Sequence, residues 1–461
     1  MALFSALATD DTIVALATPQ GSGAIAVIRL SGPDAIAIAN KVFRGKDLDK
    51  QASHTAHFGT IRTEEGHILD EVLATIFVAP RSFTRENVVE ISCHGSQFIV
   101  REILNLLIRQ GARPAKAGEF TQRAFLNGQF DLAQAEAVAD LIQADSAAAH
   151  EAALHQMRGG FSQEIKDLRE KLIHFASMVE LELDFGEEDV EFANRNDLRK
   201  LVNELQTVIA RLIKSFAVGS VLKEGVPTVI AGKPNAGKST LLNALLNEEK
   251  AIVSEIAGTT RDFIEDELII EGIHFRFIDT AGLRETTDIV EAMGVKRTRE
   301  KLQQASIILY LFDLSDETPE SIGKEINLLE NLGKPFLPIG NKVDSASQEL
   351  MEALKGFEQM LYISAKDKTN LEDLKQQILE KANLASFRTG NTIVTTARHY
   401  ESLLKTHAAL QDVLNGLEIG VTGDLLALDI RTALYHLGEI TGEVTTDDLL
   451  ANIFSKFCIG K

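Results

Sequence analysis

Cysteine is nearly absent from this sequence, which has only Cys93 and Cys458 among its 461 residues. Two thiols cannot build a disulfide framework, so we expect a reducing environment. The apolar run beside the motifs described below, Ile307 to Phe312, is far too short to cross a bilayer. The first residues also lack a basic segment followed by a long apolar run. We therefore expect a cytoplasmic protein with no signal peptide and no membrane association.

Positive charge is in deficit, since the formal net charge is −20. That balance argues against non-specific binding to polyanions, so any contact with nucleic acid must be local or shared with a partner. Hydrophobic residues make up 45% and charged residues 25%, an ordinary composition for a chain with real cores. The length predicts two to four domains.

Proline is missing from residues 115–226 and 339–461, and such stretches are permissive for helices. Residues 1–122 contain prolines and alternate strand-like runs, such as AIAVIRL and VVEISC, with turn signals such as PQGSG. An amphipathic helical pattern then ends at Gly111. Residues 1–122 therefore predict a small α+β domain.

Apolar residues recur at three- and four-residue spacing through residues 123–220 and again through 385–461. Between them, residues 221–384 alternate apolar strands with helices, which favours a largely parallel sheet. The acidic stretch Gly186 to Phe192 is interpreted as a solvated loop between helices. The prediction is a multidomain α/β plus α protein, with an α/β domain inserted between the two halves of a discontinuous helical domain.

The sequence GKPNAGKS, Gly232 to Ser239, fits the phosphate-binding loop and lies between a strand and a helix. Glycines let backbone N–H groups close around phosphates, and the helix N-terminus favours negative charge. We expect Lys238 to hold the β- and γ-phosphates and the Ser239 hydroxyl to bind Mg²⁺. The nucleotide-binding residues predicted in this loop are Asn235, Ala236, Gly237, Lys238, Ser239 and Thr240.

Four further motifs follow in the order typical of GTPases. Thr259 and Thr260 can offer a hydroxyl to the metal, Thr260 as the Mg²⁺ ligand, and Asp279 ends an apolar strand where a carboxylate holds Mg²⁺ through water. Asp344 can accept hydrogen bonds from both guanine donors, which adenine lacks. The remaining motif residues are Thr280, Ala281 and Gly282 near the γ-phosphate, Asn341 and Lys342, and Ser364, Ala365 and Lys366, which offer a backbone N–H to the guanine oxygen. The sequence therefore predicts GTP binding.

Leu283 does not fit the usual pattern, because many GTPases have a water-orienting glutamine at that position. The runs PNAGKST, AGTTRD, DTAGLR and FCIGK, with DTIVALATPQGSGAIAVIRLSG near the start, resemble the MnmE (TrmE) family of tRNA modification GTPases. The resemblance extends from about residue 11 to Lys461. It implies an N-terminal folate-binding and dimerisation domain, a helical domain and an inserted P-loop GTPase domain.

For catalysis, the resemblance implies that K⁺ and a meeting of two G domains replace the missing glutamine. Asn235, Ser254, Ile256 and Thr259 would bind K⁺, and Glu291 would orient the attacking water. The nucleotide would also contact the neighbouring positions Glu255, Ala257 and Gly258. Read without the resemblance, Glu291 is a solvated carboxylate at the start of a helix.

The resemblance further implies binding of 5-formyl- or methylene-tetrahydrofolate by Arg29, Glu90, Gln129 and Lys461. Many family members have lysine at the position of Gln129. Taken alone, Arg29 and Glu90 are strand residues for which a sheet pair or a surface charge is the ordinary interpretation. Cys458 matches the family's C-terminal cysteine, and it is either a nucleophile beside basic residues or a small buried residue.

The preferred function is a homodimeric GTPase that joins an MnmG-type FAD protein in a heterotetramer or larger complex. Together they would place a carboxymethylaminomethyl-type group on C5 of the wobble uridine of tRNA. One alternative is a GTPase switch for ribosome or RNA assembly, although no basic RNA-binding module is evident. A second is a folate enzyme whose G domain is only regulatory. Cys93 beside His94 resembles a catalytic pair, but adjacent strand residues point to opposite faces, so we expect a structural role.

Overall fold

The computed structural model describes residues 11–184, 194–249, 266–278, 302, 305–357, 360–382 and 392–460. Contacts divide the chain into two compact units, each built from separated segments. The first unit comprises Met1–Ile142, Gln156–Leu205 and Lys405–Lys461, and the second comprises Gln143–His155 and Gln206–Leu404. The four domain boundaries expected from the sequence remain predictions.

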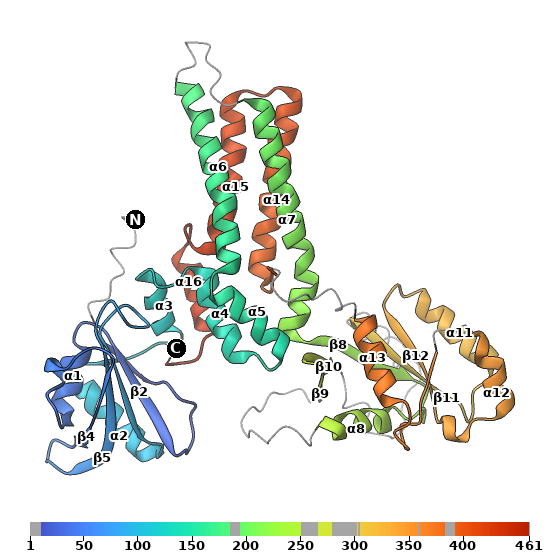
Figure 1. Ribbon diagram of the computed structural model, residues 1–461, viewed down its shortest axis with the longest axis horizontal. Coiled ribbons are helices and arrows are strands. Elements are labelled where there is room, and N and C mark those ends of the chain that lie inside the picture. The colour runs from blue at the N-terminus through green and yellow to red at the C-terminus, as the bar shows by residue number, and fades with distance from the viewer. Residues whose placement is uncertain are drawn as a thin grey trace. The chain divides into compact units, whose positions relative to one another are not determined.

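A seven-stranded sheet forms the N-terminal part of the first unit (Figure 1). Its order is β3-β4-β5-β6-β2-β1-β7, and every neighbouring pair is antiparallel except β1 and β7. The strands are β1 (Ile13–Leu16), β2 (Ile25–Ser31), β3 (Phe43–Arg44), β4 (Thr55–Arg62), β5 (Ile68–Phe77), β6 (Val88–His94) and β7 (Arg113–Pro114). The predicted α+β character of this region is confirmed.

Helices α1 (Ala35–Val42) and α2 (Gln97–Arg109) cover one face of this sheet. In β2, Ala26, Ile28 and Leu30 are buried in the same core, as the period of two in a half-buried strand requires. After α2 the chain turns at Gly111, whose φ of 113° lies in the left-handed region that favours glycine. The helix end predicted at this residue is therefore confirmed.

The helices of the first unit come from segments that precede and follow the second sheet in the sequence. Helix α6 (Gly160–Asp184) packs along α15 (Gly423–Thr441), as Figure 1 shows. Arg431 of α15 forms an ion pair with Glu180 of α6 at 2.7 Å, and Arg169 of α6 pairs with Glu443. Helices α3 (Glu119–Leu126), α4 (Leu132–Gln143) and α16 (Asp447–Ser455) supply a smaller apolar cluster.

Helix α7 (Arg195–Glu224) is the one helix among the described residues that is long and apolar enough to cross a membrane by length and composition. A single helix of this kind is weak evidence for membrane insertion. Its buried side chains recur at spacings of four and three residues: Leu198, Val202, Leu205, Ile209 and Leu212. That spacing puts them on one face, as in a helix packed within a bundle.

A six-stranded sheet, in the order β13-β12-β11-β8-β10-β9, forms the core of the second unit. Its strands are β8 (Val226–Gly232), β9 (Asp266–Ile270), β10 (Ile273–Phe277), β11 (Ile307–Asp313), β12 (Phe336–Asn341) and β13 (Leu361–Tyr362). All pairs are parallel except β9 and β10, so the largely parallel sheet predicted from the sequence is confirmed.

Helices cover both faces of the second sheet. Leucines of α8 (Lys238–Glu249) and α13 (Leu371–Lys381) pack into the larger core, and Leu329 of α11 (Pro319–Glu330) packs on the other face. The short helix α12 (Gln348–Ala353) follows β12. Helix α14 (Ala397–Ile419) returns beside α7, where Tyr400 stacks on Phe216 with ring centres 4.4 Å apart.

Two elements differ from the sequence pattern. The helical pattern expected through residues 123–220 is interrupted at Ala144–Ser146, between α4 and α5 (Ala147–Met157). The contacts of α5 then place residues 143–155 in the second unit. The acidic stretch Gly186–Phe192, predicted to be a loop, lies outside the described residues.

Candidate functional site

Three of the predicted nucleotide motifs follow strands of the second sheet. Strands β8, β11, β12 and β13 are parallel, so the loops after them share one edge. The chain moves from β8 toward β10 on one side and later returns to place β11 on the other. Such a reversal at the carboxyl ends of parallel strands is where open α/β sheets bind ligands. The phosphate-binding loop lies at this point.

The loop between β8 and α8 is a tight backbone structure. Gly232 and Gly237 have φ of 142° and 93°, and Asn235 between them is also left-handed, with φ of 65°. A Cβ on Gly232 would lie 2.3 Å from the carbonyl oxygen of Leu311 in the neighbouring strand. Glycine is therefore required here both for conformation and for close approach.

Lys238 begins α8 and folds back over the loop. Its Nζ donates hydrogen bonds to the carbonyl oxygens of Gly232 at 2.8 Å and Lys233 at 2.7 Å. Burial lowers the pKa of Lys238 from its ordinary value. The ammonium is therefore held at the loop where a phosphate oxygen could replace a carbonyl partner. Ser239 and Thr240 follow it in the first turn of the helix.

Asn341, at the end of β12, joins the phosphate loop to the loop after β13. Its Nδ2 donates to the carbonyl oxygen of Ala236 at 2.8 Å, and its Oδ1 accepts from the backbone N–H of Ala365 at 3.0 Å. The side chain is only 2% exposed. A buried amide with partners on two loops fixes the position of both. We call the Asn341 side chain with these two hydrogen bonds the brace.

The predicted guanine-recognising carboxylate, Asp344, is exposed beside this brace. A hydrogen bond from the Ser364 hydroxyl, a second from Ser345 and the charge of Lys366 hold the pKa of Asp344 below its usual range. The group is therefore an ionised acceptor at neutral pH, as pairing with two guanine donors requires.

Asp313 is a residue of this site that the sequence analysis did not single out. It ends β11 and accepts a hydrogen bond from Lys342, whose backbone is left-handed with φ of 64°. Burial of Asp313 acts to raise its pKa, but the hydrogen bonds from Lys342 and Ser315, together with the charge of Lys342, outweigh this and lower the pKa. The available signal was an acidic residue at the end of the apolar strand IILYLFD.

The structure thus brings together the predicted residues of three motifs: Asn235, Ala236, Gly237, Lys238, Ser239, Thr240, Asn341, Lys342, Asp344, Ser364, Ala365 and Lys366. The other predicted GTPase residues lie outside the described residues: Ser254, Glu255, Ile256, Ala257, Gly258, Thr259, Thr260, Asp279, Thr280, Ala281, Gly282, Leu283 and Glu291. Their roles remain predictions.

In the first unit, the predicted folate residues Arg29 and Glu90 face each other across β2 and β6 and form an ion pair at 2.8 Å. The Arg29 guanidinium also lies over the rings of Phe83 and Phe120, at 5.6 and 5.8 Å from their centres. The sheet-pair interpretation of these two residues is therefore confirmed. It does not conflict with ligand binding, because both side chains remain partly exposed.

The C-terminal segment closes against the same region. The carbonyl oxygen of Gly460 accepts a hydrogen bond from Arg29 at 3.4 Å, and Ile459 forms a β-bridge with Ala117. A Cβ on Gly460 would lie 2.2 Å from the carbonyl oxygen of Leu16, so the glycine permits this approach. Lys461, the next residue, lies outside the described residues.

The remaining candidates of this unit, Gln129, Cys458 and Cys93, differ in their exposure and in their contacts. Gln129 accepts a hydrogen bond from Arg85 at 3.1 Å. Cys458 is exposed, so the alternative of a small buried residue is wrong. Cys93 is buried, and burial together with the Asp70 carboxylate raises its pKa to about 11. His94 next to it is exposed and instead pairs with Asp70 at 2.7 Å, so the expected structural role of Cys93 is confirmed.

Comparison with known proteins gives the family. Residues 12–129 match the model of the GTP-binding protein TrmE N-terminus, and residues 132–458 match the MnmE helical domain. The chain is 64% identical to the tRNA modification GTPase MnmE of Cytophaga hutchinsonii over 98% of both chains. The protein of that name from Flavobacterium psychrophilum is 56% identical, over 98% of this chain and 99% of that one. That from Bacteroides fragilis is 50% identical, over 98% and 100%. With both terminal domains and nearly the whole length matched, this chain belongs to the MnmE family of tRNA modification GTPases.

Proposed function

We propose that this chain hydrolyses GTP in a K⁺-stimulated reaction, and that the hydrolysis drives modification of C5 of the wobble uridine in tRNA. The observation that carries the proposal is the brace of Asn341, which holds the phosphate loop and the base-recognition loop at one edge of the sheet. A nucleotide needs both loops at a fixed separation, because one contacts the phosphates and the other the base.

The residues present fit the ions that the reaction requires. Hard cations prefer oxygen ligands, and the Ser239 hydroxyl in the first turn of α8 would hold Mg²⁺ together with Thr260. Asn235 is exposed beside Lys238, and its left-handed backbone is a local strain of the kind found at functional sites. Its side-chain oxygen would hold K⁺, with Ser254, Ile256 and Thr259 completing the ligand set.

These ions would supply positive charge that offsets the charge developing on the phosphates during hydrolysis. The chain's own residues position the reactants: Lys238 holds the β- and γ-phosphates, and Asp344 holds the base. Glu291 would orient the attacking water in place of the glutamine that Leu283 replaces. Asp279 would hold Mg²⁺ through water, and the backbone N–H of Gly282 would approach the γ-phosphate.

The N-terminal domain would contribute a one-carbon folate and the dimer. Arg29 and Glu90 are a charged pair with aromatic rings on one side, which suits a ligand having a polar heterocycle and an anionic tail. Gln129 and Lys461 would complete that site, and the exposed thiol of Cys458 would act there as a nucleophile. An MnmG-type FAD protein would join this homodimer in a heterotetramer or larger complex.

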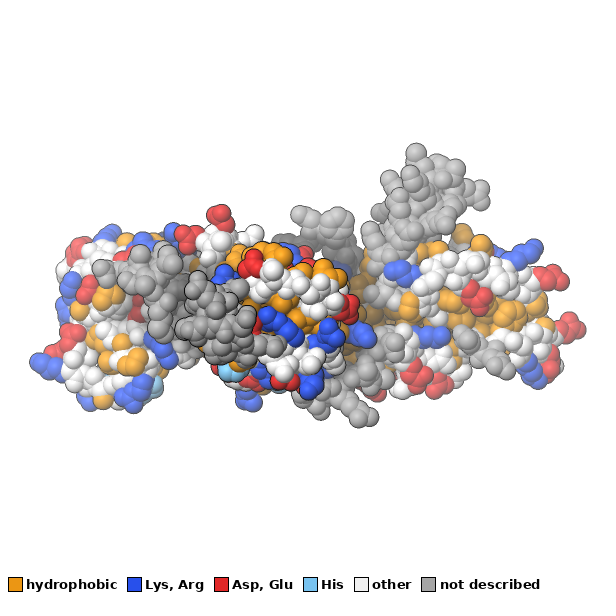
Figure 2. Space-filling view, turned by 90° about the horizontal axis from the view of Figure 1, so that it is seen from above, with side chains coloured by type: hydrophobic (Ala, Val, Ile, Leu, Met, Phe, Trp, Pro, Cys, Tyr) orange, Lys and Arg blue, Asp and Glu red, His pale blue; other side chains and the backbone are white. Residues whose placement is uncertain are grey.

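Contact with tRNA would be local. Figure 2 shows Lys and Arg side chains interspersed with Asp and Glu on the face displayed, without an extended field of positive charge there. Together with the net charge of −20, this favours sharing the tRNA with the partner rather than binding it alone. The cytoplasm, where tRNA and the partner occur, is the proposed location.

The test compares GTP hydrolysis in K⁺ and in Na⁺ at equal ionic strength. We expect a much faster rate in K⁺, because the proposed ligands form a cage suited to the larger ion. Asn235→Ala should abolish the difference while GTP affinity stays nearly unchanged. Lys233→Ala is a matched control in the same loop, because Lys233 pairs with Glu317 at 2.9 Å instead of offering an oxygen ligand. Equal rates in both salts for the parent protein would rule out the potassium mechanism.

A further inference from the structure

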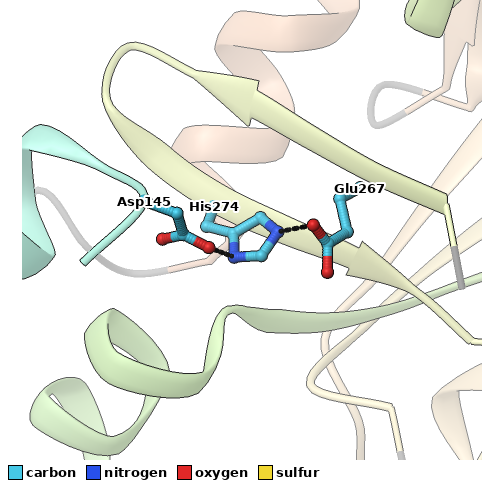
Figure 3. Close-up of side chains that lie close together, drawn as sticks. All are labelled: Asp145, Glu267 and His274. Carbon is cyan, nitrogen blue, oxygen red and sulfur yellow. Dashed lines mark ion pairs between the residues drawn. The ribbon is translucent and has the colours of Figure 1, made fainter. Parts of the chain in front are cut away.

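A histidine paired with two carboxylates lies near the beginning of strand β10 in the second sheet, away from the nucleotide loops. Figure 3 shows the ring of His274, in β10, between the carboxylates of Asp145 and Glu267. Its Nδ1 lies 2.9 Å from Asp145 Oδ2, and its Nε2 lies 3.5 Å from Glu267 Oε2. The histidine side chain is only 8% exposed, whereas the carboxylates are 49% and 59% exposed.

One polar atom from each of these three side chains lies within 4.8 Å of the other two, so the cluster has the side chains of a metal site. The two carboxylates, however, contact different nitrogens of the ring, and a single ion can bind only one of these nitrogens. Both ring nitrogens of a histidine are polar, so one side chain can contact a carboxylate on each side. The three side chains therefore connect separate segments of the chain, and we call Asp145, Glu267 and His274 the clasp.

The clasp lies where two helical segments meet the sheet. Asp145 belongs to the loop that leads into α5. Gly225 connects the end of α7 to β8, and a Cβ there would lie 3.2 Å from His274 Nδ1. The start of α5 is joined to the turn before β10 by a second contact, since the N–H of Ala148 donates to the carbonyl oxygen of Gly272 at 3.4 Å. His274 therefore lies against both the loop before α5 and the connection from α7 to β8.

Strand β10 leads from the clasp to the nucleotide motif. It pairs with β8, the strand before the phosphate loop, through Phe275 with Val226 and Phe277 with Thr228. Two residues after Phe277 the chain reaches Asp279, the first residue of the motif assigned to the γ-phosphate. A displacement of that motif would therefore be transmitted along β10, whose other end contacts the loop before α5 and its first turn.

We propose that His274 is a positioning residue. Its pairs with Asp145 and Glu267 transmit the change between the GDP-bound and GTP-bound states from β10 to the start of α5. The proposal rests on the proposed GTPase function. The element that responds to the nucleotide comprises the loop of Asp145 and the first turn of α5. Because Asp145 approaches the ring more closely than Glu267 does, the Asp145 pair carries the larger share of the coupling.

Hydrogen exchange on the full-length protein tests this coupling without measuring turnover. Backbone amides of residues 147–151 are compared with GDP bound and with a non-hydrolysable GTP analogue bound. In the parent protein we expect their exchange rates to differ between the two nucleotides by about fivefold, the low end of couplings between sites. Identical rates in the two states would overturn the proposal.

Three variants locate the coupling. Asp145→Asn and Glu267→Gln change exposed groups and should therefore keep the fold, while His274→Phe removes both pairs but fills a similar volume. We expect the nucleotide-dependent difference to disappear in His274→Phe and in Asp145→Asn, and to fall only partly in Glu267→Gln. His150→Phe is the control, because His150 is exposed on α5 outside the clasp. A full difference retained in Asp145→Asn and His274→Phe would refute the role of the clasp.

Nucleotide affinity is measured on the same samples. All variants should bind both nucleotides within about twofold of the parent, since the clasp does not contact the ligand. A parent protein that binds no guanine nucleotide would contradict the proposed function itself. A parent that binds both nucleotides and shows no difference at α5 would contradict only the coupling.

Discussion

Gly237→Ala should weaken GTP binding through a contact visible in the structure. Gly237 has φ of 93°, and a Cβ added there would lie 2.2 Å from Nδ2 of Asn341. That distance is well inside van der Waals contact, so the asparagine has to move. The displaced group is the one that donates to the carbonyl oxygen of Ala236 at 2.8 Å.

Two contributions set the magnitude of this effect. A left-handed alanine costs about 1–2 kcal/mol, and losing a buried hydrogen bond so that a carbonyl is left unpaired costs about 1–3 kcal/mol. One shift of the loop partly relieves both, so we expect a combined cost of about 3 kcal/mol, with each 1.4 kcal/mol equal to a factor of ten. The dissociation constant for GTP should therefore rise by roughly 10²-fold.

The assay is a fluorescence titration with a labelled guanine nucleotide, alongside urea unfolding. Gly333→Ala is the matched control, because Gly333 has φ of 64° but no atoms within 4 Å of an added Cβ. It should lose stability from the backbone conformation alone and keep its GTP affinity. Asn341→Ala removes the clash but not the backbone cost, so the double variant with Gly237→Ala should bind more weakly than Asn341→Ala by only about 1–2 kcal/mol. A Gly237→Ala protein that binds GTP within about threefold of the parent, well below 1.4 kcal/mol, would show that the brace does not hold the nucleotide site.

Three further predictions concern single side chains. Asp344→Asn should weaken GTP binding and favour xanthine nucleotides, whose 2-oxo group can pair with the new amide donor; a competition titration in which GTP keeps its full advantage would contradict the guanine assignment. Glu291→Ala should lower the single-turnover hydrolysis rate by about 10²-fold at unchanged GTP affinity, and a rate within about threefold would return it to an ordinary helix-start carboxylate. A thiol-reactive probe at pH 8 should label Cys458 and spare Cys93, whose pKa is raised to about 11 by burial and Asp70; mass spectrometry of the labelled peptides checks this, and labelling of Cys93 in the folded protein would show that it is not protected.

The sequence predicted elements where one physical signal dominates. The apolar runs of β8, β11 and β12 are buried on both faces, and their hydrophobicity alone marks them as strands of a parallel sheet. The break between α4 and α5 was missed because the alanines on either side of it favour a helix, although Ser146 caps α5 by accepting a hydrogen bond from the N–H of Ala149. Tertiary contacts of α5 with the turn at Gly272 decide its position, and such contacts leave no local trace in the sequence.

The same limit applied to the sites. Motif spacing identified Lys238 and Asp344, because their chemistry depends on residue type at a fixed place in the chain. It did not identify Asp313 or His274, whose partners, Lys342 and Asp145, lie 29 and 129 residues away along the sequence. A long-range ion pair is visible only once the fold brings its members together.

The brace also changes how Asn341 itself is understood. The sequence placed it with Asp344 in one base-recognition motif, yet both polar atoms of its side chain are engaged by the protein, with Ala236 on one side and Ala365 on the other. Because each polar atom of this side chain already holds one loop, we expect Asn341 to act mainly by positioning the two loops. Asp344 is exposed and ionised, as recognition of base donors requires. Substitution of Asn341 should therefore weaken every purine nucleotide alike, whereas substitution of Asp344 should change which base is preferred. Two residues of one motif would then have different roles, with Asn341 positioning the loops and Asp344 selecting the base.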